Sequence, residues 1–187
     1  AQAYIASGMY QNVLVIGAES LSNLVDWKDR STCILFGDGA GAVVLRAEEG
    51  ESYHMVTHSD GSKGEALTCD TGSFMKMDGQ EVFKFAARQV PACITEVVEH
   101  NHLMVEDIDY FILHQANRRI VEAVAKRMKV ELTKFPMNLQ EYGNTSSASI
   151  PLLLDEMNRE GRLKKGQKLV LAGFGAGLSW GASLLEW

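Results

Sequence analysis

Two side chains that can donate hydrogen bonds stand where a binding crevice is expected. His114 ends an apolar run over residues 108–114, and the sequence that follows it begins a helix. Residues at the carboxyl ends of buried strands in α/β sheets line the ligand crevice. Asn144 lies in a polar loop, again just before a predicted helix. A neutral imidazole and a carboxamide can together donate two hydrogen bonds to a developing oxyanion.

Each of these residues also has a structural interpretation. A single histidine is often a structural or surface residue, and its place at a strand end makes the two interpretations of His114 about equally good. Asn144 is surrounded by Thr and Ser, and all three residue types cap helices. Spacing alone leaves both alternatives open.

Two glycine-rich runs need separate treatment. Residues 173–177 follow an apolar strand, and backbone N–H groups in such a loop can bind an anion or oxyanion, although a tight turn explains the run equally well. Residues 37–41 superficially resemble a dinucleotide-binding loop. They lead into the apolar run 42–45, which favours a strand rather than the required helix, so we interpret them as a hairpin turn.

A basic segment stands out in a chain whose net charge is −6. It contains one acid, Glu122, among five cations: Arg118, Arg119, Lys126, Arg127 and Lys129. On a helix, Arg119 and Lys126 lie about two turns apart on one face. The segment is either a solvated helix face or a docking surface for an acidic partner or a phosphate.

The three cysteines do not resemble nucleophiles. Cys33 falls in a predicted strand, Cys69 in a polar loop and Cys93 in the middle of a helix, whereas a reactive thiol needs a helix N-terminus or a cationic neighbour. The histidines and cysteines have no metal-ligand spacing, so we expect no metal site. The number of cysteines is odd and they are widely spaced, which favours a reducing, cytoplasmic compartment.

The elements that must position these residues alternate between strand and helix. Helices are predicted over 1–7, 80–101, 117–128 and 147–161, and strands over 13–16, 33–36, 42–46, 53–58 and 108–114, with a strand, a glycine loop and a strand from 168 onward. The runs 59–78 and 136–143 are predicted as a long surface loop and an irregular stretch. This alternation predicts a mostly parallel α/β sheet, and the run 13–16 is typical of a strand buried on both faces.

Composition sets wider limits. The chain has 187 residues, of which 46% are hydrophobic and 22% charged, as in ordinary globular proteins. No apolar run approaches the roughly 20 residues that a membrane span needs. The acidic balance argues against a nucleic-acid-binding protein. The polar, glycine-broken stretch 48–52 is the best candidate for a domain boundary.

Six stretches across the chain carry a resemblance to a known family: FGDGAGAVVL (36–45), HSDGSKGEALT (58–68), MDGQEVFKFA (77–86), LHQANRRI (113–120), YGNTSSASIPLLLDE (142–156) and GFGAGLSWGASLL (173–185). The chain resembles β-ketoacyl-acyl-carrier-protein synthase III. This implies a thiolase-like α/β fold of α-β-α-β-α layers, of which residues 1–50 are a remnant of the N-terminal half and residues 51–187 the C-terminal half.

The resemblance also implies an activity. The family condenses acetyl-CoA, or another short acyl-CoA, with malonyl-acyl-carrier-protein, and the coenzyme A thioester is a substrate, so that no cofactor is needed. The family is homodimeric. Its catalytic cysteine would precede Ala1, and we therefore expect this chain alone to be inactive in condensing the two substrates.

Individual residues carry over by their motifs. His114 and Asn144 match the catalytic pair, and the backbone N–H of Ala176 matches an oxyanion donor. Pantetheine contacts are implied for Gly79, Gln80, Phe83 and Asn117, although Gln80 replaces an Asn seen in some members. Contacts with the carrier protein are implied for Gln115, Arg118 and Arg119.

Two alternatives remain. One is a synthase III-like enzyme of secondary metabolism with another acyl primer. The other is an inert fragment, or a subunit that needs its missing half. For a chain without that half, we expect poor solubility or obligate pairing, because strand edges and apolar surface would be exposed.

Overall fold

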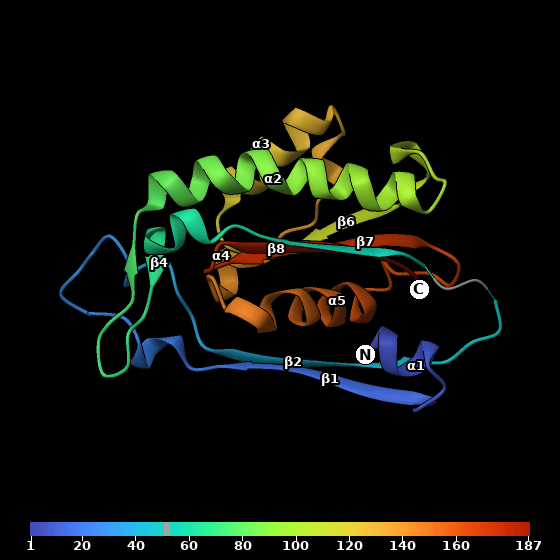
Figure 1. The fold of residues 1–187 in the computed structure, drawn as a ribbon, viewed down its shortest axis with the longest axis horizontal. Coiled ribbons are helices and arrows are strands. Elements are labelled where there is room, and N and C mark those ends of the chain that lie inside the picture. Colours follow the sequence, from blue (N-terminus) through green and yellow to red (C-terminus); the bar gives the residue numbers. More distant parts are fainter. Residues whose placement is uncertain (51–52) are drawn as a thin grey trace.

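A computed structural model describes residues 1–50 and 53–187, and its elements stack in layers (Figure 1). A four-stranded sheet in the order β3-β8-β7-β6 lies at the centre. Helices α2 and α3 cover one face of this sheet, and α5 covers the other. A second sheet, formed by β1 and β2, lies on the far side of α5. These are four of the expected α-β-α-β-α layers.

The helices are α1 (Gln2–Ala6), α2 (Gly79–His100), α3 (Arg118–Met128), α4 (Leu139–Tyr142) and α5 (Ser149–Arg159). The strands of the two larger sheets are β1 (Asn12–Glu19), β2 (Gly39–Arg46), β3 (Met55–Ser59), β6 (Tyr110–Leu113), β7 (Lys168–Gly175) and β8 (Ser179–Glu186). The predicted long helices are confirmed to within about two residues at each end. Among the described residues, no helix is long and apolar enough to cross a membrane.

The central sheet is mixed, so the prediction of a mostly parallel sheet is wrong. Strands β6 and β7 pair in parallel, whereas β7–β8 and β3–β8 are antiparallel. Only residues 176–178 join β7 to β8, and so short a connection can join antiparallel neighbours only. The helices α3 and α5 therefore connect the parallel pair β6 and β7, as the alternation predicts. The strands β3 and β8 pair antiparallel and do not follow this pattern.

The segment before β2 differs most from its prediction. Residues 33–36 form turns, with one isolated bridge at Phe36. The predicted strand over 33–36 is therefore wrong, and Cys33 lies in a turn instead. Gly39 and Gly41 lie inside β2 rather than in a hairpin turn. A Cβ on Gly41 would lie 2.9 Å from Pro151 Cβ, so glycine lets the strand pack directly against α5. Glycine here reports a close approach between elements, not a turn.

The predicted surface loop 59–78 contains short regular elements. A 3-10 helix spans Gly61–Ala66, and β4 (Leu67–Thr68) pairs with β5 (Lys76–Met77). The expected boundary stretch 48–52 is only partly visible, because residues 51–52 lie outside the described residues. The division into 1–50 and 51–187 stays a prediction.

The β1–β2 sheet is covered on one face only. Val43 packs into the core beneath α5, whereas Leu14, Ile16 and Val44 on the other face are 59%, 62% and 66% exposed. Leu14 stands opposite Val44, so these side chains form a continuous apolar surface. The prediction that the run 13–16 is buried on both faces is therefore wrong for this chain.

Candidate active site

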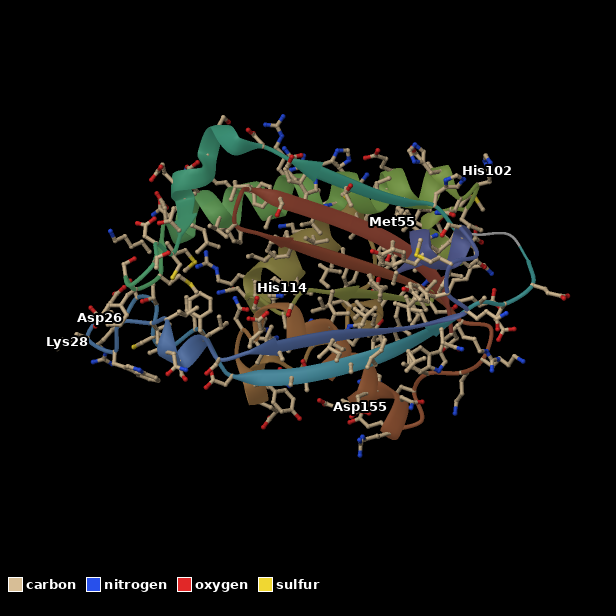
Figure 2. All side chains as sticks on the ribbon, turned by 60° about the horizontal axis from the view of Figure 1, so that its bottom comes forward. Asp26, Lys28, Met55, His102, His114 and Asp155 are labelled. Atoms are coloured by element: carbon tan, nitrogen blue, oxygen red, sulfur yellow. The ribbon has the colours of Figure 1, made fainter. Side chains whose placement is uncertain are left out.

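His114, labelled in Figure 2, follows directly after β6 and is partly buried. Its backbone N–H donates to Ala172 O on β7 at 2.8 Å, which extends the parallel pairing by one residue. The imidazole meets the ring of Phe174 edge-on, with centroids 5.2 Å apart. Burial lowers the pKa of His114 to about 4, so the ring is neutral near pH 7 and carries one N–H.

Asn144 is held by the backbone of another segment. Its N–H donates to Leu35 O and its carbonyl accepts from Gly37 N–H, both at 2.9 Å. The side-chain Oδ1 accepts the N–H of Ser146 at 2.9 Å. Because this oxygen is occupied by a donor, the Nδ2 hydrogens are the part of the amide that can bond a ligand.

His114 and Asn144 line one cavity of about 1150 Å³. The same cavity is lined by further residues expected in the site: Gly79, Gln80, Phe83, Asn117 and Arg119. They come from the first turns of α2 and α3, which lie side by side over the sheet, and from the loops after β6 and before α5. His114 and Asn144, which lie thirty residues apart in the sequence, thus reach one cavity.

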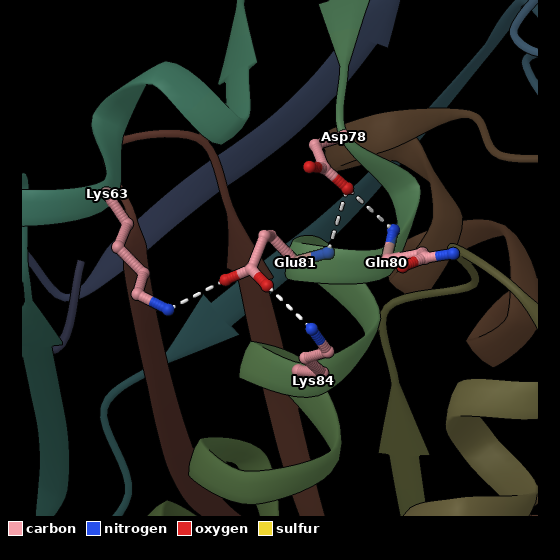
Figure 3. A network of polar contacts seen from close by, with 5 residues as sticks. All are labelled: Lys63, Asp78, Gln80, Glu81 and Lys84. Atoms are coloured by element: carbon pink, nitrogen blue, oxygen red, sulfur yellow. Dashed lines mark hydrogen bonds and ion pairs between the residues drawn. The ribbon is translucent and has the colours of Figure 1, made fainter.

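The mouth of the cavity includes the N-terminus of α2, where polar contacts fix the chain (Figure 3). Asp78 caps the helix by accepting from the N–H groups of Gln80 and Glu81 at 3.0 and 3.1 Å. The Glu81 carboxylate bonds Lys63 at 2.7 Å and Lys84 at 2.8 Å. These two ammonium groups lower the pKa of Glu81 to about 2. The Lys63–Glu81 ion pair connects the Gly61–Ala66 helix to α2, whereas the Lys84–Glu81 pair lies within α2.

The cations of α3 have different surroundings. The Arg119 guanidinium lies 5.4 Å from the centre of the Phe83 ring, at the cavity wall. Arg118 is exposed and pairs with Glu122 at 2.7 Å. Asn117 caps the helix by accepting the N–H of Arg119 at 2.8 Å. Arg119 is therefore the cation of this segment that a ligand in the cavity meets.

Two expected site residues lie elsewhere. Gln115 is 1% exposed; its amide donates to Leu113 O at 2.7 Å and accepts from the N–H of Asn138 at 3.2 Å. A side chain so enclosed does not reach a carrier protein, and this expectation is corrected. Ala176 lies in the exposed β7–β8 turn, next to the cavity-lining Gly175, and is not itself among the described lining residues.

None of the three cysteines lines the cavity within the described part of the chain. Cys93 is buried in α2, and burial raises the pKa of its thiol to about 11. Cys69 is exposed, in the loop after β4, and donates weakly to Ser73 O. The described site has hydrogen-bond donors but no thiol nucleophile.

Comparison with known proteins adds an independent observation. The family model for 3-oxoacyl-[acyl-carrier-protein (ACP)] synthase III matches residues 1–64, and the model for its C-terminal domain matches residues 98–187. A relative from Clostridium novyi, named beta-ketoacyl-[acyl-carrier-protein] synthase III, is 48% identical over all of this chain and 62% of its own length.

The chain belongs to the 3-oxoacyl-[acyl-carrier-protein] synthase III family. The structure of the synthase III from Aquifex aeolicus matches all of this chain and 61% of its own, with a TM-score of 0.96 and 45% identity. A priming beta-ketosynthase of the R1128 polyketide pathway matches 98% of the chain and 58% of its own, with a TM-score of 0.90 and 34% identity. The chain thus spans about three-fifths of the length of the synthase III proteins it matches.

Some site residues had no signal in the sequence. Ser149 lies 2.7 Å from the His114 ring, and Glu19 on β1 bonds Ser147 in the loop that carries Asn144. The sequence has several serines and several glutamates, and no pattern distinguishes these two. Only the packing of α5 and β1 determines which of them contacts the site. The position of Phe174 beside His114 likewise depends on how β7 pairs with β6.

Proposed function

We propose that this chain carries the decarboxylating and pantetheine-binding part of a β-ketoacyl-acyl-carrier-protein synthase III. The whole reaction joins a short acyl group from coenzyme A to a malonyl group on acyl carrier protein. The observation that carries the proposal is the meeting of neutral His114 and the Asn144 amide at one cavity. The identity of 48% and 45% to the synthase III proteins of Clostridium novyi and Aquifex aeolicus, against 34% to the polyketide-priming enzyme, favours a fatty acid role over one in secondary metabolism.

The proposed chemistry follows from two hydrogen-bond donors. When the bond between the malonyl α-carbon and its carboxylate breaks, carbon dioxide leaves and the electron pair forms an enolate on the thioester. His114 and Asn144 donate to that enolate oxygen, and one such donor typically contributes about 3–4 kcal/mol to the transition state. The α-carbon then attacks an acyl thioester, whose thiolate leaves. The acyl-bearing cysteine must come from outside these 187 residues.

Cavity shape and charge support the substrate class. Gly79, Gln80 and Phe83 on α2 and Asn117 on α3 line the approach to His114, as a pantetheine arm requires. Arg119 at the wall suits an acidic carrier protein or a phosphate, with Arg118 beside it on the surface. We propose that the backbone N–H of Ala176 serves the second oxyanion, and that the coenzyme A thioester is used as substrate without a further cofactor.

Partners and location belong to the same proposal. The apolar outer face of the β1–β2 sheet is suited to a missing half of the fold, and a homodimer follows from the family. The three free cysteines suit the reducing cytoplasm.

A decarboxylation assay tests the function on the chain itself. Malonyl-CoA and malonyl-acyl-carrier-protein are supplied, and release of carbon dioxide is measured. His114→Ala and Asn144→Ala should each lower the rate by about 10²–10³-fold. Arg159→Ala, an exposed change at the end of α5, is the matched control. Variants of the pair that keep the wild-type rate would exclude the proposed roles.

The same samples test the missing nucleophile. Incubation with acetyl-CoA should leave the mass at 20.6 kDa, and no ketoacyl product should form, because no cysteine of the described chain faces the cavity. Ketoacyl product from the isolated chain would contradict this.

A further inference from the structure

A buried hydroxyl on α5 contacts the imidazole of His114. Ser149, the first residue of α5, is 2% exposed, and its Oγ lies 2.7 Å from His114 Nδ1. The backbone N–H of Gln115 donates to the same oxygen at 3.2 Å. The contact joins the start of α5 to the loop after β6, which are far apart in the sequence.

The direction of the Ser149–His114 hydrogen bond follows from counting hydrogens. A serine hydroxyl has one hydrogen to donate and two lone pairs to accept with. One lone pair accepts the Gln115 N–H. Among the described residues, His114 Nδ1 is the remaining partner of Ser149 Oγ. If Nδ1 carried a proton, it would donate to Oγ, and the buried hydroxyl hydrogen would be left without an acceptor, which folded proteins avoid.

We propose that Ser149 donates its hydroxyl hydrogen to His114 Nδ1 and thereby holds the neutral imidazole in the tautomer that carries its proton on Nε2. The edge-on contact with Phe174 constrains the ring plane but does not distinguish the two nitrogens. Ser149 is thus a positioning residue. Its catalytic meaning rests on the proposed function, since the Nε2–H is then the donor available to an enolate, whereas the tautomer itself does not depend on any reaction.

Nitrogen-15 NMR of the imidazole rings tests this on the full chain without substrate. At pH 7 the His114 ring should show a protonated Nε2 and an unprotonated Nδ1, with His114→Gln used to assign its signals. A protonated Nδ1 in the wild-type chain would overturn the proposal. This measurement needs no substitution at Ser149, so it decides the direction of the hydrogen bond even where a variant fails to fold.

Three variants then test whether Ser149 is the cause. Ser149→Ala should shift the tautomer ratio of His114 by at least about tenfold, and Ser149→Thr, which keeps a hydroxyl, should restore the Nε2–H form. The matched control is Ser147→Ala, because that hydroxyl lies two residues earlier in the chain but bonds Glu19. An unchanged ratio in folded Ser149→Ala, or an equal shift in Ser147→Ala, would overturn the proposal.

The two proposals fail separately. If the proton lies on Nδ1 but decarboxylation still depends on His114, the proposed role of Ser149 is wrong and the proposed function stands. An Nε2–H tautomer that depends on Ser149, in a chain that releases no carbon dioxide from either malonyl thioester, leaves the role of Ser149 and removes the function.

Discussion

Because the His114 imidazole is neutral in the folded chain, the free energy of unfolding should depend on pH. The pKa of His114 is about 4 in the folded chain and about 6.5 when unfolded, so between these pH values the unfolded chain binds more protons. The free energy of unfolding should therefore fall as pH drops from 6.5 to 4, by about 3 kcal/mol for this group. Urea titrations across this range check the effect, with His114→Gln as the non-titrating reference. Equal slopes in both proteins would refute it.

The pKa of Glu81, at the mouth of the cavity, should depend on its two lysine partners. Its pKa lies near 2 because Lys63 and Lys84 stabilise the carboxylate, so this contribution to stability is present above about pH 4.5 and is lost as the pH falls toward 2. Lys63→Met should move the pKa of Glu81 back toward 4.5, as followed by carbon-13 NMR of the carboxyl group. Lys28→Met, which changes an exposed lysine that forms no ion pair with Glu81 among the described residues, should leave it unchanged. A Glu81 pKa that ignores Lys63 would show that the ion pair does not form in solution.

At the scale of elements, glycine positions test how closely β1 is packed against the loop that precedes α5. A Cβ on Gly17 would lie 2.6 Å from the backbone carbonyl carbon of Ser147, whereas a Cβ on Gly173 in β7 meets no atom within 4 Å. Gly17→Ala should lower the free energy of unfolding by about 1–3 kcal/mol, the usual effect of overpacking. Thermal or urea unfolding checks this, with Gly173→Ala as the matched strand control. Equal effects would mean that the Asn144 loop gives way.

Helices were predictable because their apolar spacing repeats over many turns. Residues 80–101 show this: nine side chains of α2 are buried at helical intervals. The apolar run 33–36 was wrongly predicted as a strand, since a short run between turn residues carries no period. The role of Gly41 was likewise hidden, because it depends on Pro151, more than a hundred residues away.

The site divides in the same way. His114, Asn144 and the α2 residues were found through their motifs, and the structure brings them to one cavity. Gln115 was misplaced because a side chain next to a catalytic residue in sequence can point into the core. No sequence pattern shows which serine of residues 146–149 meets the imidazole, since this depends on how α5 docks against β6.

At the scale of the whole molecule, the outer face of the β1–β2 sheet predicts association. Leu14, Ile16 and Val44 form an apolar surface at the sheet, and such surfaces drive contact between proteins. The isolated chain should self-associate in light scattering coupled to size-exclusion chromatography, and Ile16→Lys should reduce this. Leu132→Lys, exposed beyond α3, is the control. A chain that stays monomeric at all concentrations would contradict the expectation.

Helix α5 lies between the two sheets, and Leu153, Leu154 and Met157 are buried there. One side of this helix carries the exposed Asp155 and Arg159, but its buried side meets water only when a neighbouring sheet moves away. Its central amides should exchange with deuterium at the rate of the most protected hydrogens in the molecule. The deuterium exchange rate of the α5 amides would then report how often the two sheets separate. It would also report how often the hydrogen bond between Ser149 and His114 breaks.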